Sequence, residues 1–390
     1  MSAIRAEFLS SPGLQQVLTT LTAAGHQALI VGGAVRNAML GEDVSDVDLS
    51  TDALPQQVID LAGAAGLKTV PTGIEHGTVT VLTTESGPWR SFEITTFRRD
   101  VETDGRHAVV SFSTDLAEDA RRRDFTMNAL YATATGEVLD PIGGLPDLLA
   151  RRLRFVGDPR ARITEDYLRI LRFFRFHAWY GAPGAADPDA LAACAELAEG
   201  LNRISKERIG EEMQKLLKAP DPLDALCLME QTGVLQHVLP GARLDLLTAL
   251  RRVETAPDWR LRLATLQADD PRGSLRLSNR SARIVMQLRE LAQGDDSLER
   301  IAYRHGQDLA RQVAQYRLAE GRDLPPDWDR RIQRAAQQKL PISATDLMPQ
   351  LSGAALGAAL RMAEDHWIDS DFRATAPDLV ALARRAEGSE

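Results

Sequence analysis

The hydrophobic pattern of the sequence changes near residue 153. Before it, apolar and polar residues alternate in stretches such as 77–83 and 91–97, with the period of two that is typical of half-buried strands. Beyond it, stretches rich in Ala, Leu and Arg with helical spacing run to the end of the chain. The sequence therefore predicts an α+β protein, with a small sheet in the first 150 residues and helices after it.

Composition limits the classes of protein that fit this pattern. The 390 residues are 44% hydrophobic and 26% charged, as in a globular protein long enough for two or three cores. The net charge of −9 argues against coating nucleic acid through bulk charge, but it permits a local basic track. No signal-peptide pattern is present, and no apolar run approaches the roughly 20 residues of a membrane span. We therefore expect no membrane contact and a cytoplasmic location.

A glycine pair comes directly after the apolar stretch 26–31, which we expect to be a strand. Gly32 and Gly33 permit a tight turn and the close approach of backbone N–H groups to a ligand. The stretch 34–40 is typical of a short helix, whose start favours anions, and Arg36 in its first turn can reach the same anion. Glycine pairs usually only make turns, so this pair indicates a ligand site only in combination with the residues after it.

Two aspartates spaced by one residue come next. On a strand, Asp46 and Asp48 would project from the same face while Val47 faces a core. Such carboxylates repel each other unless a cation or proton lies between them, and Mg²⁺ prefers oxygen ligands while leaving room for substrate phosphates. Glu93 supplies a third carboxylate if its expected strand is a neighbour. The pair alone would fit a solvated strand end, but with the glycine turn it predicts a bound nucleoside triphosphate.

These residues belong to a series of motifs that resembles a known family. In order, "GGAVRNAMLG", "SDVDLSTDALP", "GIEHGTVTV", "FEITTFRRD", "RRRDFTMNALY", "DPIGGLPDL" and "TEDYLRILRFFRF" resemble the class II tRNA nucleotidyltransferase/poly(A) polymerase family. The resemblance implies a polymerase-β-like nucleotidyltransferase head at 1–150. It implies an all-α remainder, divided into a nucleotide-selecting neck at 151–218, a body at 219–300 and a tRNA-binding tail at 301–390.

The resemblance also assigns roles to single residues. Asp46 and Asp48 would hold the metal, with Mg²⁺ as the cofactor, and Glu93 would join them as a less certain catalytic carboxylate. The nucleotide-binding residues would be Gly33, Arg36, Arg123, Asp166, Arg169, Arg172 and Arg175. Asp124 and Asn128, which come after Arg123 in the same motif, are expected to be structural. Asn37 stands where many relatives have Asp, and we expect little change of function from it.

The neck segment can also be examined without the resemblance. Its apolar residues predict one buried stripe of a helix, formed by Tyr167, Ile170, Leu171, Phe174 and Ala178. Asp166 and Arg169 would be neighbours on another face of this helix, at i and i+3. Cytosine and adenine both offer an amino donor beside an unprotonated ring nitrogen, whereas guanine and uracil present a carbonyl and a ring N–H. An accepting Asp166 beside a donating Arg169 would therefore select CTP and ATP without a template. The alternative is a solvated face with an ordinary ion pair.

Several functions remain open at this point. The motifs favour template-independent addition of CCA to the 3′ end of tRNA from CTP and ATP, with release of pyrophosphate. A poly(A) polymerase would share the head, but the sequence 371–390 is not the strongly basic tail expected of one. An enzyme that adds only C or only A also fits, whereas an inactive RNA-binding protein would not need three carboxylates. The thirteen arginines of 272–334, against nine acidic residues, predict either a track for RNA phosphates or simply solvated helices. No oligomeric state is predicted.

Overall fold

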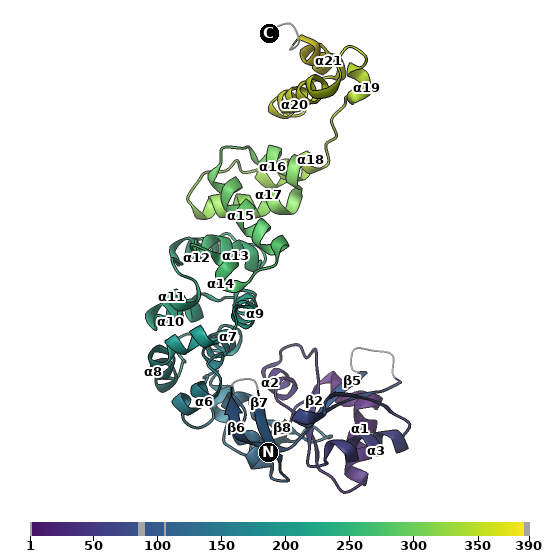
Figure 1. Cartoon of the computed structure of the whole chain (residues 1–390), viewed down its shortest axis with the longest axis vertical. Helices are drawn as coiled ribbons and strands as arrows, with labels where there is room; N and C mark the ends of the chain where they lie inside the picture. The colour runs from purple at the N-terminus through teal and green to yellow at the C-terminus, as the bar shows by residue number, and fades with distance from the viewer. Residues whose placement is uncertain (1, 85–89, 105–106, 386–390) are drawn as a thin grey trace. The chain divides into compact units, whose positions relative to one another are not determined.

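The computed structural model describes residues 2–84, 90–104 and 107–385 (Figure 1). The chain divides into two compact units, one of Met1–Pro240 with Gly273–Arg276 and one of Gly241–Arg272 with Leu277–Glu390. None of the described helices is both long and apolar enough to cross a bilayer. The expected head, neck, body and tail are a finer division than these two units and stay a prediction.

A mixed sheet forms the first part of the first unit. Across the described residues its strand order is β3-β4-β5-β2-β1-β8-β9. The strands are β1 (Ala28–Val31), β2 (Asp48–Thr51), β3 (Lys68–Gly73), β4 (Thr78–Leu82), β5 (Ser91–Thr96), β8 (Tyr131–Ala132) and β9 (Val138–Leu139). In the middle of the sheet, β2 runs antiparallel to β1 and parallel to β5. The α+β prediction is confirmed, and β1, β4 and β5 lie where strands were expected.

Short helices surround this sheet. They are α1 (Pro12–Ala23), α2 (Gly33–Leu40), α3 (Pro55–Ala64), α4 (Leu116–Arg121) and α5 (Leu145–Leu149), with the 3-10 turns η1 (Glu7–Ser10), η2 (Ile74–His76) and η3 (Thr126–Asn128). Helices α1 and α3 pack against each other and against the sheet, as the lower right of Figure 1 shows. A separate antiparallel pair, β6 (Arg98–Asp104) and β7 (His107–Phe112), leads from β5 towards α4.

The rest of the first unit is helical. It contains α6 (Pro159–Glu165), α7 (Arg169–Tyr180), α8 (Pro188–Glu196), η4 (Ala198–Arg203), α9 (Lys206–Leu217), α10 (Leu223–Gln231) and α11 (Val234–Val238). Helix α7 packs against both α9 and α10. It therefore has helical neighbours on one side, while its aromatic residues reach the head on another.

The buried surface of α7 is wider than the single stripe that the sequence predicts. Ile170, Leu171 and Phe174 are buried as expected, but Phe173, Phe176 and His177 are buried too, whereas Tyr167 and Ala178 are only half-buried. The additional contacts are aromatic. The ring centre of Phe125, just before η3, lies 5.1 Å from that of Phe176 and 6.3 Å from that of Phe173. The neck helix is thus fixed to the motif that contains Arg123.

The second unit is entirely helical within the residues described. Its helices are α12 (Asp245–Leu250), α13 (Trp259–Thr265), α15 (Asn279–Gln293), α16 (Leu298–His305), α17 (Gln307–Ala319), α18 (Trp328–Ala336), α19 (Ala344–Leu347), α20 (Gly353–Asp369) and α21 (Ala376–Arg385), and α14 (Pro271–Leu275) lies at the boundary of the units. The last three helices share a core that includes Leu347, Ala363 and Leu379. Between residues 153 and 385 the structure describes no strand, only single bridge residues at Leu153, Phe155 and Ala186, which agrees with the sequence pattern.

Candidate active site

The glycine turn lies between the end of β1 and the start of α2. Gly32 has φ of +66°, a left-handed conformation that favours glycine, and its N–H donates to the carbonyl of Leu130 (3.1 Å). The first bond of α2 runs from Arg36 N–H to Gly32 O (3.0 Å), which leaves the N–H groups of Gly33 and the next two residues at a free helix start. The backbone N–H of Gly33 is therefore available to a ligand, which is what a phosphate-binding turn requires.

Two arginines flank this turn. A Cβ atom added to Gly32 would lie 3.6 Å from Nη1 of Arg123, and one added to Gly33 would lie 3.7 Å from Nη2 of Arg36. The fold thus brings Arg123, which comes after α4, to the same place as Arg36 in α2. Backbone N–H groups and two guanidinium groups converge there, and this combination suits a triphosphate.

The paired aspartates lie at the start of β2, and the strand begins two residues later than the sequence suggested. Asp46 is in the extended segment before the strand, and Asp48 is its first residue. Both are exposed, whereas Val47 between them is buried, so the expected alternation of faces is present. Val31, the residue before the glycine turn, pairs with Asp48 across the sheet, which places this carboxylate next to the turn.

Glu93 joins the carboxylates from the neighbouring strand. In the parallel pairing of β2 with β5, Leu49 is opposite Ile94, so Asp48 and Glu93 each precede a paired residue. The pKa of Asp48 is raised, first because surrounding protein atoms desolvate its carboxylate although it keeps access to solvent, and then because Glu93 and Asp46 add negative charge. Arg123 opposes this rise in the pKa. Negative charge that Arg123 offsets only in part is therefore concentrated around Asp48.

This donor set fits a divalent cation whose coordination is completed by a substrate. Among the described residues, no three His, Cys, Asp or Glu side chains are gathered closely enough to form a metal site by themselves. A magnesium-type ion, however, commonly uses one or two carboxylates together with substrate phosphates. Such an ion would relieve the repulsion of Asp48 by Asp46 and Glu93.

Arg123 is held in place by a buried acid that the sequence analysis missed. Asp119 in α4 is fully buried and accepts from Nη2 of Arg123 (3.1 Å), from Nε of Arg122 (2.7 Å) and from the Tyr131 hydroxyl (2.7 Å). Although burial raises the pKa of Asp119, the two arginines outweigh it and the pKa is lowered. The i,i+4 spacing of Asp119 and Arg123 in the sequence could have revealed this pair.

A chain of hydrogen bonds connects Arg36 to the neck. Nη1 of Arg36 donates to Oδ1 of Asn128 (2.5 Å), and Nδ2 of Asn128 donates to Oδ1 of Asp124 (3.0 Å). The other oxygen of Asp124 accepts from Nε (3.1 Å) and Nη2 (2.5 Å) of Arg172 in α7. The residues that were expected to be structural thus connect the turn side of the site to the neck motif.

Asp166 does not lie on the neck helix as the sequence suggested. It comes after α6 in an extended conformation, its Oδ1 accepts from the N–H of Leu168 (3.1 Å), and its Oδ2 accepts from Nη2 of Arg208 (2.6 Å). Arg169 starts α7 and pairs instead with Glu165. The expected place of Asp166 on the helix is therefore wrong, because α7 begins three residues after it, although the N–H of Arg169 donates to the carbonyl of Asp166 (2.9 Å) and keeps the two residues together.

Both residues nevertheless keep groups that a ligand can use. Nη1 of Arg169 is bound to the Arg162 carbonyl (2.7 Å) and to Glu165, whereas its Nε and Nη2 have no partner within the described residues. Each oxygen of Asp166 accepts one hydrogen bond from the protein, and a carboxylate can accept about four. Arg175, by contrast, is bound to Glu212 (2.5 Å) and lies over the Phe176 ring.

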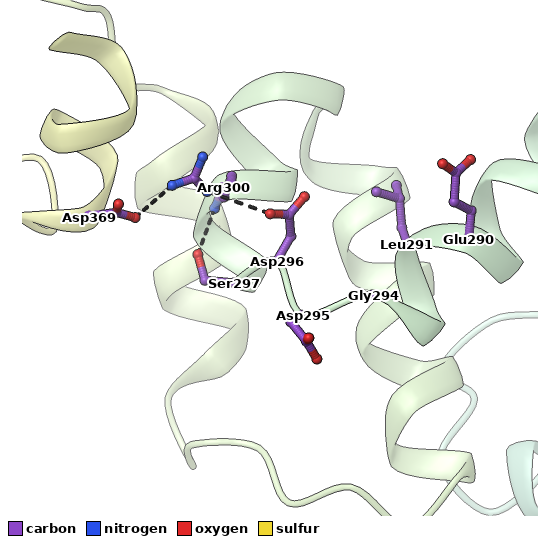
Figure 2. Close-up of a pocket in the computed structure, with 8 residues that line it drawn as sticks. All are labelled: Glu290, Leu291, Gly294, Asp295, Asp296, Ser297, Arg300 and Asp369. Atoms are coloured by element: carbon purple, nitrogen blue, oxygen red, sulfur yellow. Dashed lines mark hydrogen bonds and ion pairs between the residues drawn. The ribbon is translucent and has the colours of Figure 1, made fainter. Parts of the chain in front are cut away.

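Most arginines of the predicted RNA track are engaged inside the second unit. Arg289 and Arg317 donate to main-chain carbonyls, such as those of Ala264 and Leu291. Figure 2 shows a pocket in this unit where Arg300 donates to Asp369 (2.7 Å) and faces Asp296. Arg280 and Arg283 on α15 are both exposed, and neither has a partner in the part of the chain that the structure describes. The basic track is therefore much smaller than its arginine count suggested.

Comparisons with known proteins agree with this architecture. The profile of the poly A polymerase head domain matches residues 28–154, and that of the probable RNA- and SrmB-binding site of polymerase A matches residues 186–245. CCA tRNA nucleotidyltransferase 1, mitochondrial, from Mus musculus is 33% identical over 404 residues, which cover 97% of this chain and 91% of that protein. A CCA-adding enzyme from Streptococcus sanguinis is 36% identical over 80% of this chain and 79% of its own length.

Solved structures show the same likeness in three dimensions. The crystal structure of the Bacillus stearothermophilus CCA-adding enzyme in complex with CTP is 27% identical and has a TM-score of 0.76, with 97% of this chain and 98% of that chain covered. A Thermotoga maritima CCA-adding enzyme complexed with tRNA shares the fold at 17% identity and a TM-score of 0.69. The similarity therefore extends across both units.

Proposed function

The chain belongs to the tRNA nucleotidyltransferase/poly(A) polymerase family, and from this premise we propose that it adds C, C and A to the 3′ end of tRNA. It uses CTP and ATP, needs no nucleic acid template and releases pyrophosphate. The observation that carries the proposal is the convergence of Asp48, Arg123 and the Gly32–Gly33 turn at adjacent ends of β1 and β2. We also propose a cytoplasmic location, which the free thiols of both cysteines support.

The triphosphate binds at the glycine turn. The N–H group of Gly33 and the start of α2 face its phosphates, and Arg36 and Arg123 supply two positive charges on either side. Asp119 fixes the orientation of Arg123, so that its Nη1 points towards the turn. The 3′ hydroxyl of the RNA attacks the α-phosphorus, a new O3′–P bond forms, and the bond to the β-phosphate oxygen breaks.

The paired carboxylates hold the cofactor. Asp46 and Asp48 would bind a divalent ion, which we propose to be Mg²⁺, and when bound it lowers the pKa of the attacking hydroxyl and neutralises the leaving pyrophosphate. Glu93 adds negative charge beside Asp48, which raises the pKa of Asp48 and favours a bound cation. Arg36 and Arg123 supply the positive charge that the protein itself offers to the phosphates at the glycine turn.

The base is selected by the neck. One oxygen lone pair of Asp166 accepts the amino group of cytosine or adenine, and Nε or Nη2 of Arg169 donates to the adjacent ring nitrogen. Guanine and uracil would place a carbonyl against the carboxylate and an N–H against the guanidinium. By analogy with base readout in nucleic acids, such a bidentate pair discriminates by about 1–3 kcal/mol. Arg208 and Glu165 hold the two side chains in place without using all of their capacity.

The test uses tRNA transcripts that lack the last three, the last two or the last nucleotide. Each is incubated with the purified chain, Mg²⁺ and either CTP, ATP or both, and the products are resolved at single-nucleotide length. We expect three additions to the first transcript, two to the second and one to the third. A long A ladder would indicate a poly(A) polymerase, arrest after C a C-only enzyme, and addition of A alone an A-only enzyme.

Two variants test the metal assignment. Asp48→Asn should abolish addition while the chain stays folded, because it removes a metal ligand and leaves the strand intact. Asp43→Asn is the matched control, since Asp43 is an exposed acid in the same connection between α2 and β2. Full activity of a folded Asp48→Asn variant would reject the metal assignment, and no product from the unmodified chain with any transcript would reject the proposed function.

A further inference from the structure

Tyr180 is the last residue of α7 and contacts Arg36, which lies 144 positions earlier in the chain. Its hydroxyl accepts a hydrogen bond from Nη2 of Arg36 (2.8 Å), and the guanidinium carbon lies 3.9 Å from the centre of its ring. The ring of Phe176, one turn earlier, lies 5.2 Å from the same carbon. The end of the neck helix thus gives Arg36 both an acceptor and an aromatic surface.

The other partners of Arg36 are neutral as well. Oδ1 of Asn37 accepts from Nε (3.1 Å) and Nη2 (2.9 Å), and Oδ1 of Asn128 accepts from Nη1 (2.5 Å). Arg36 is only 6% exposed, and no carboxylate in the described part of the chain is hydrogen-bonded to it. Its charge is therefore buried and hydrogen-bonded only to neutral groups; Asp124 attracts it from beyond Asn128, and an anion bound beside it would stabilise it further.

The count of donors shows what remains for a ligand. A guanidinium has five N–H groups, and four of those on Arg36 are donated to Asn37, Asn128 and Tyr180. The fifth, on Nη1, is left for a phosphate oxygen. Because the side chain is fixed on several sides, its charge stays next to Gly33 without loss of side-chain entropy when the ligand binds.

We propose that Tyr180 is a positioning residue for nucleotide binding, which holds the Arg36 guanidinium beside the glycine turn for the triphosphate. The inference rests on the proposed function, because it assumes that a triphosphate binds at this turn. It extends that function to a residue outside the recognised motifs, and it makes the end of α7 part of the phosphate site, whereas the start of α7 belongs to the base site.

Two substitutions separate the contributions of the hydroxyl and the ring. Tyr180→Phe keeps the ring under the guanidinium and removes the acceptor, whereas Tyr180→Leu removes both. For Tyr180→Phe we expect KM for CTP and for ATP to rise together by about threefold to tenfold, the size of an ordinary hydrogen-bond contribution, because the lost bond acts on the phosphates only through Arg36. Since the contact is present before and during the reaction, kcat should stay unchanged. Tyr180→Leu should raise KM further.

Base choice provides a second readout, because a general loss of structure would change it and the proposed role of Tyr180 would not. Tyr180 acts on the phosphates, so the ratio of kcat/KM for CTP to that for UTP should be the same in Tyr180→Phe as in the unmodified chain. In an Arg36→Lys background, Tyr180→Phe should have no further effect on KM, because lysine lacks the planar group that the tyrosine holds. Trp179→Phe is the matched control, because Trp179 donates to the Lys215 carbonyl (2.9 Å) from the same end of α7.

Binding of inorganic tripolyphosphate, measured by calorimetry on the full chain, tests the inference without catalysis. We expect weaker binding to Tyr180→Phe than to the unmodified chain and to Trp179→Phe. Equal tripolyphosphate affinity and equal KM in folded Tyr180→Phe would overturn the inference, as would an equal rise of KM in Trp179→Phe. If the unmodified chain binds tripolyphosphate in the expected way but adds no nucleotide to tRNA, the proposed function fails and the role of Tyr180 stands.

Discussion

Asp124→Asn keeps the size of a buried side chain but removes the charge that faces Arg172. The side chain of Asp124 is 12% exposed and accepts hydrogen bonds from Arg172, Asn128 and the N–H of Phe125. Burial by itself raises the pKa of Asp124, but Arg172 and these hydrogen bonds lower it to about 2. The carboxylate is therefore much better stabilised in the folded chain than in the unfolded one.

The lowered pKa of Asp124 sets the size of the stability that Asp124→Asn should lose. A fall of the pKa from the ordinary 3.8 to about 2 corresponds to about 2 kcal/mol of folding free energy at neutral pH. Because the pKa of Asp124 is depressed, this contribution is present above the unfolded pKa and is lost as the pH falls through the folded pKa. At pH 3 about half of it should remain.

Urea denaturation at pH 7, 5 and 3 measures this dependence. We expect Asp124→Asn to be less stable than the unmodified chain by about 2 kcal/mol at pH 7 and 5, and by about half as much at pH 3. Asp43→Asn, an exposed substitution of the same kind, should show no such difference at any pH. A loss of stability at Asp124 that does not change with pH would refute the reasoning.

Three further outcomes are expected from the geometry. Asp48→Asn should abolish addition but should keep or raise the melting temperature of the metal-free chain at pH 7. The reason is that the raised pKa of Asp48 means that its charge destabilises the folded state at this pH. Thermal denaturation with and without Mg²⁺ and CTP checks this, and a lower melting temperature of the metal-free variant would contradict it. Asp166→Ala should lower the preference for CTP over UTP by about tenfold to a hundredfold while kcat for CTP falls less, as measured in single-nucleotide kinetics; unchanged base choice would exclude Asp166 from selection. Replacing both Arg280 and Arg283 with Gln should weaken tRNA binding and reduce the slope of log affinity against log salt by about 2, whereas an unchanged slope in filter binding would show that α15 does not contact RNA.

The sequence predicted those parts of the fold that local pattern determines. The alternation around Val47 and Leu49, the glycines that bound α2 and the proline at the start of α3 each fix a local structure without help from distant residues. The change from strands to helices near residue 153 is of the same kind. Strand β3 was missed because its sequence, Lys68–Gly73, contains a proline and two threonines and has no clear alternation.

Contacts between distant segments could not be predicted in this way. Nothing in the local pattern indicates that Tyr180 meets Arg36 or that Arg172 meets Asp124, since these pairs are formed only when α7 packs on the head. The single apolar stripe expected for α7 was too narrow for the same reason, as Phe173 is buried by contacts with the head. Asp166 was expected on the neck helix because the sequence pattern does not show that α7 begins only at Arg169.

Binding of Mn²⁺ in the presence of CTP, measured by electron paramagnetic resonance, tests most directly whether Asp46 and Asp48 hold a divalent ion against the nucleotide. The unmodified chain and Asp43→Asn should bind the ion and nucleotide with the same affinity, while Asp48→Asn should bind them at least about tenfold more weakly, because one of two carboxylate ligands is lost. Equal Mn²⁺ affinity in folded Asp48→Asn would contradict the account.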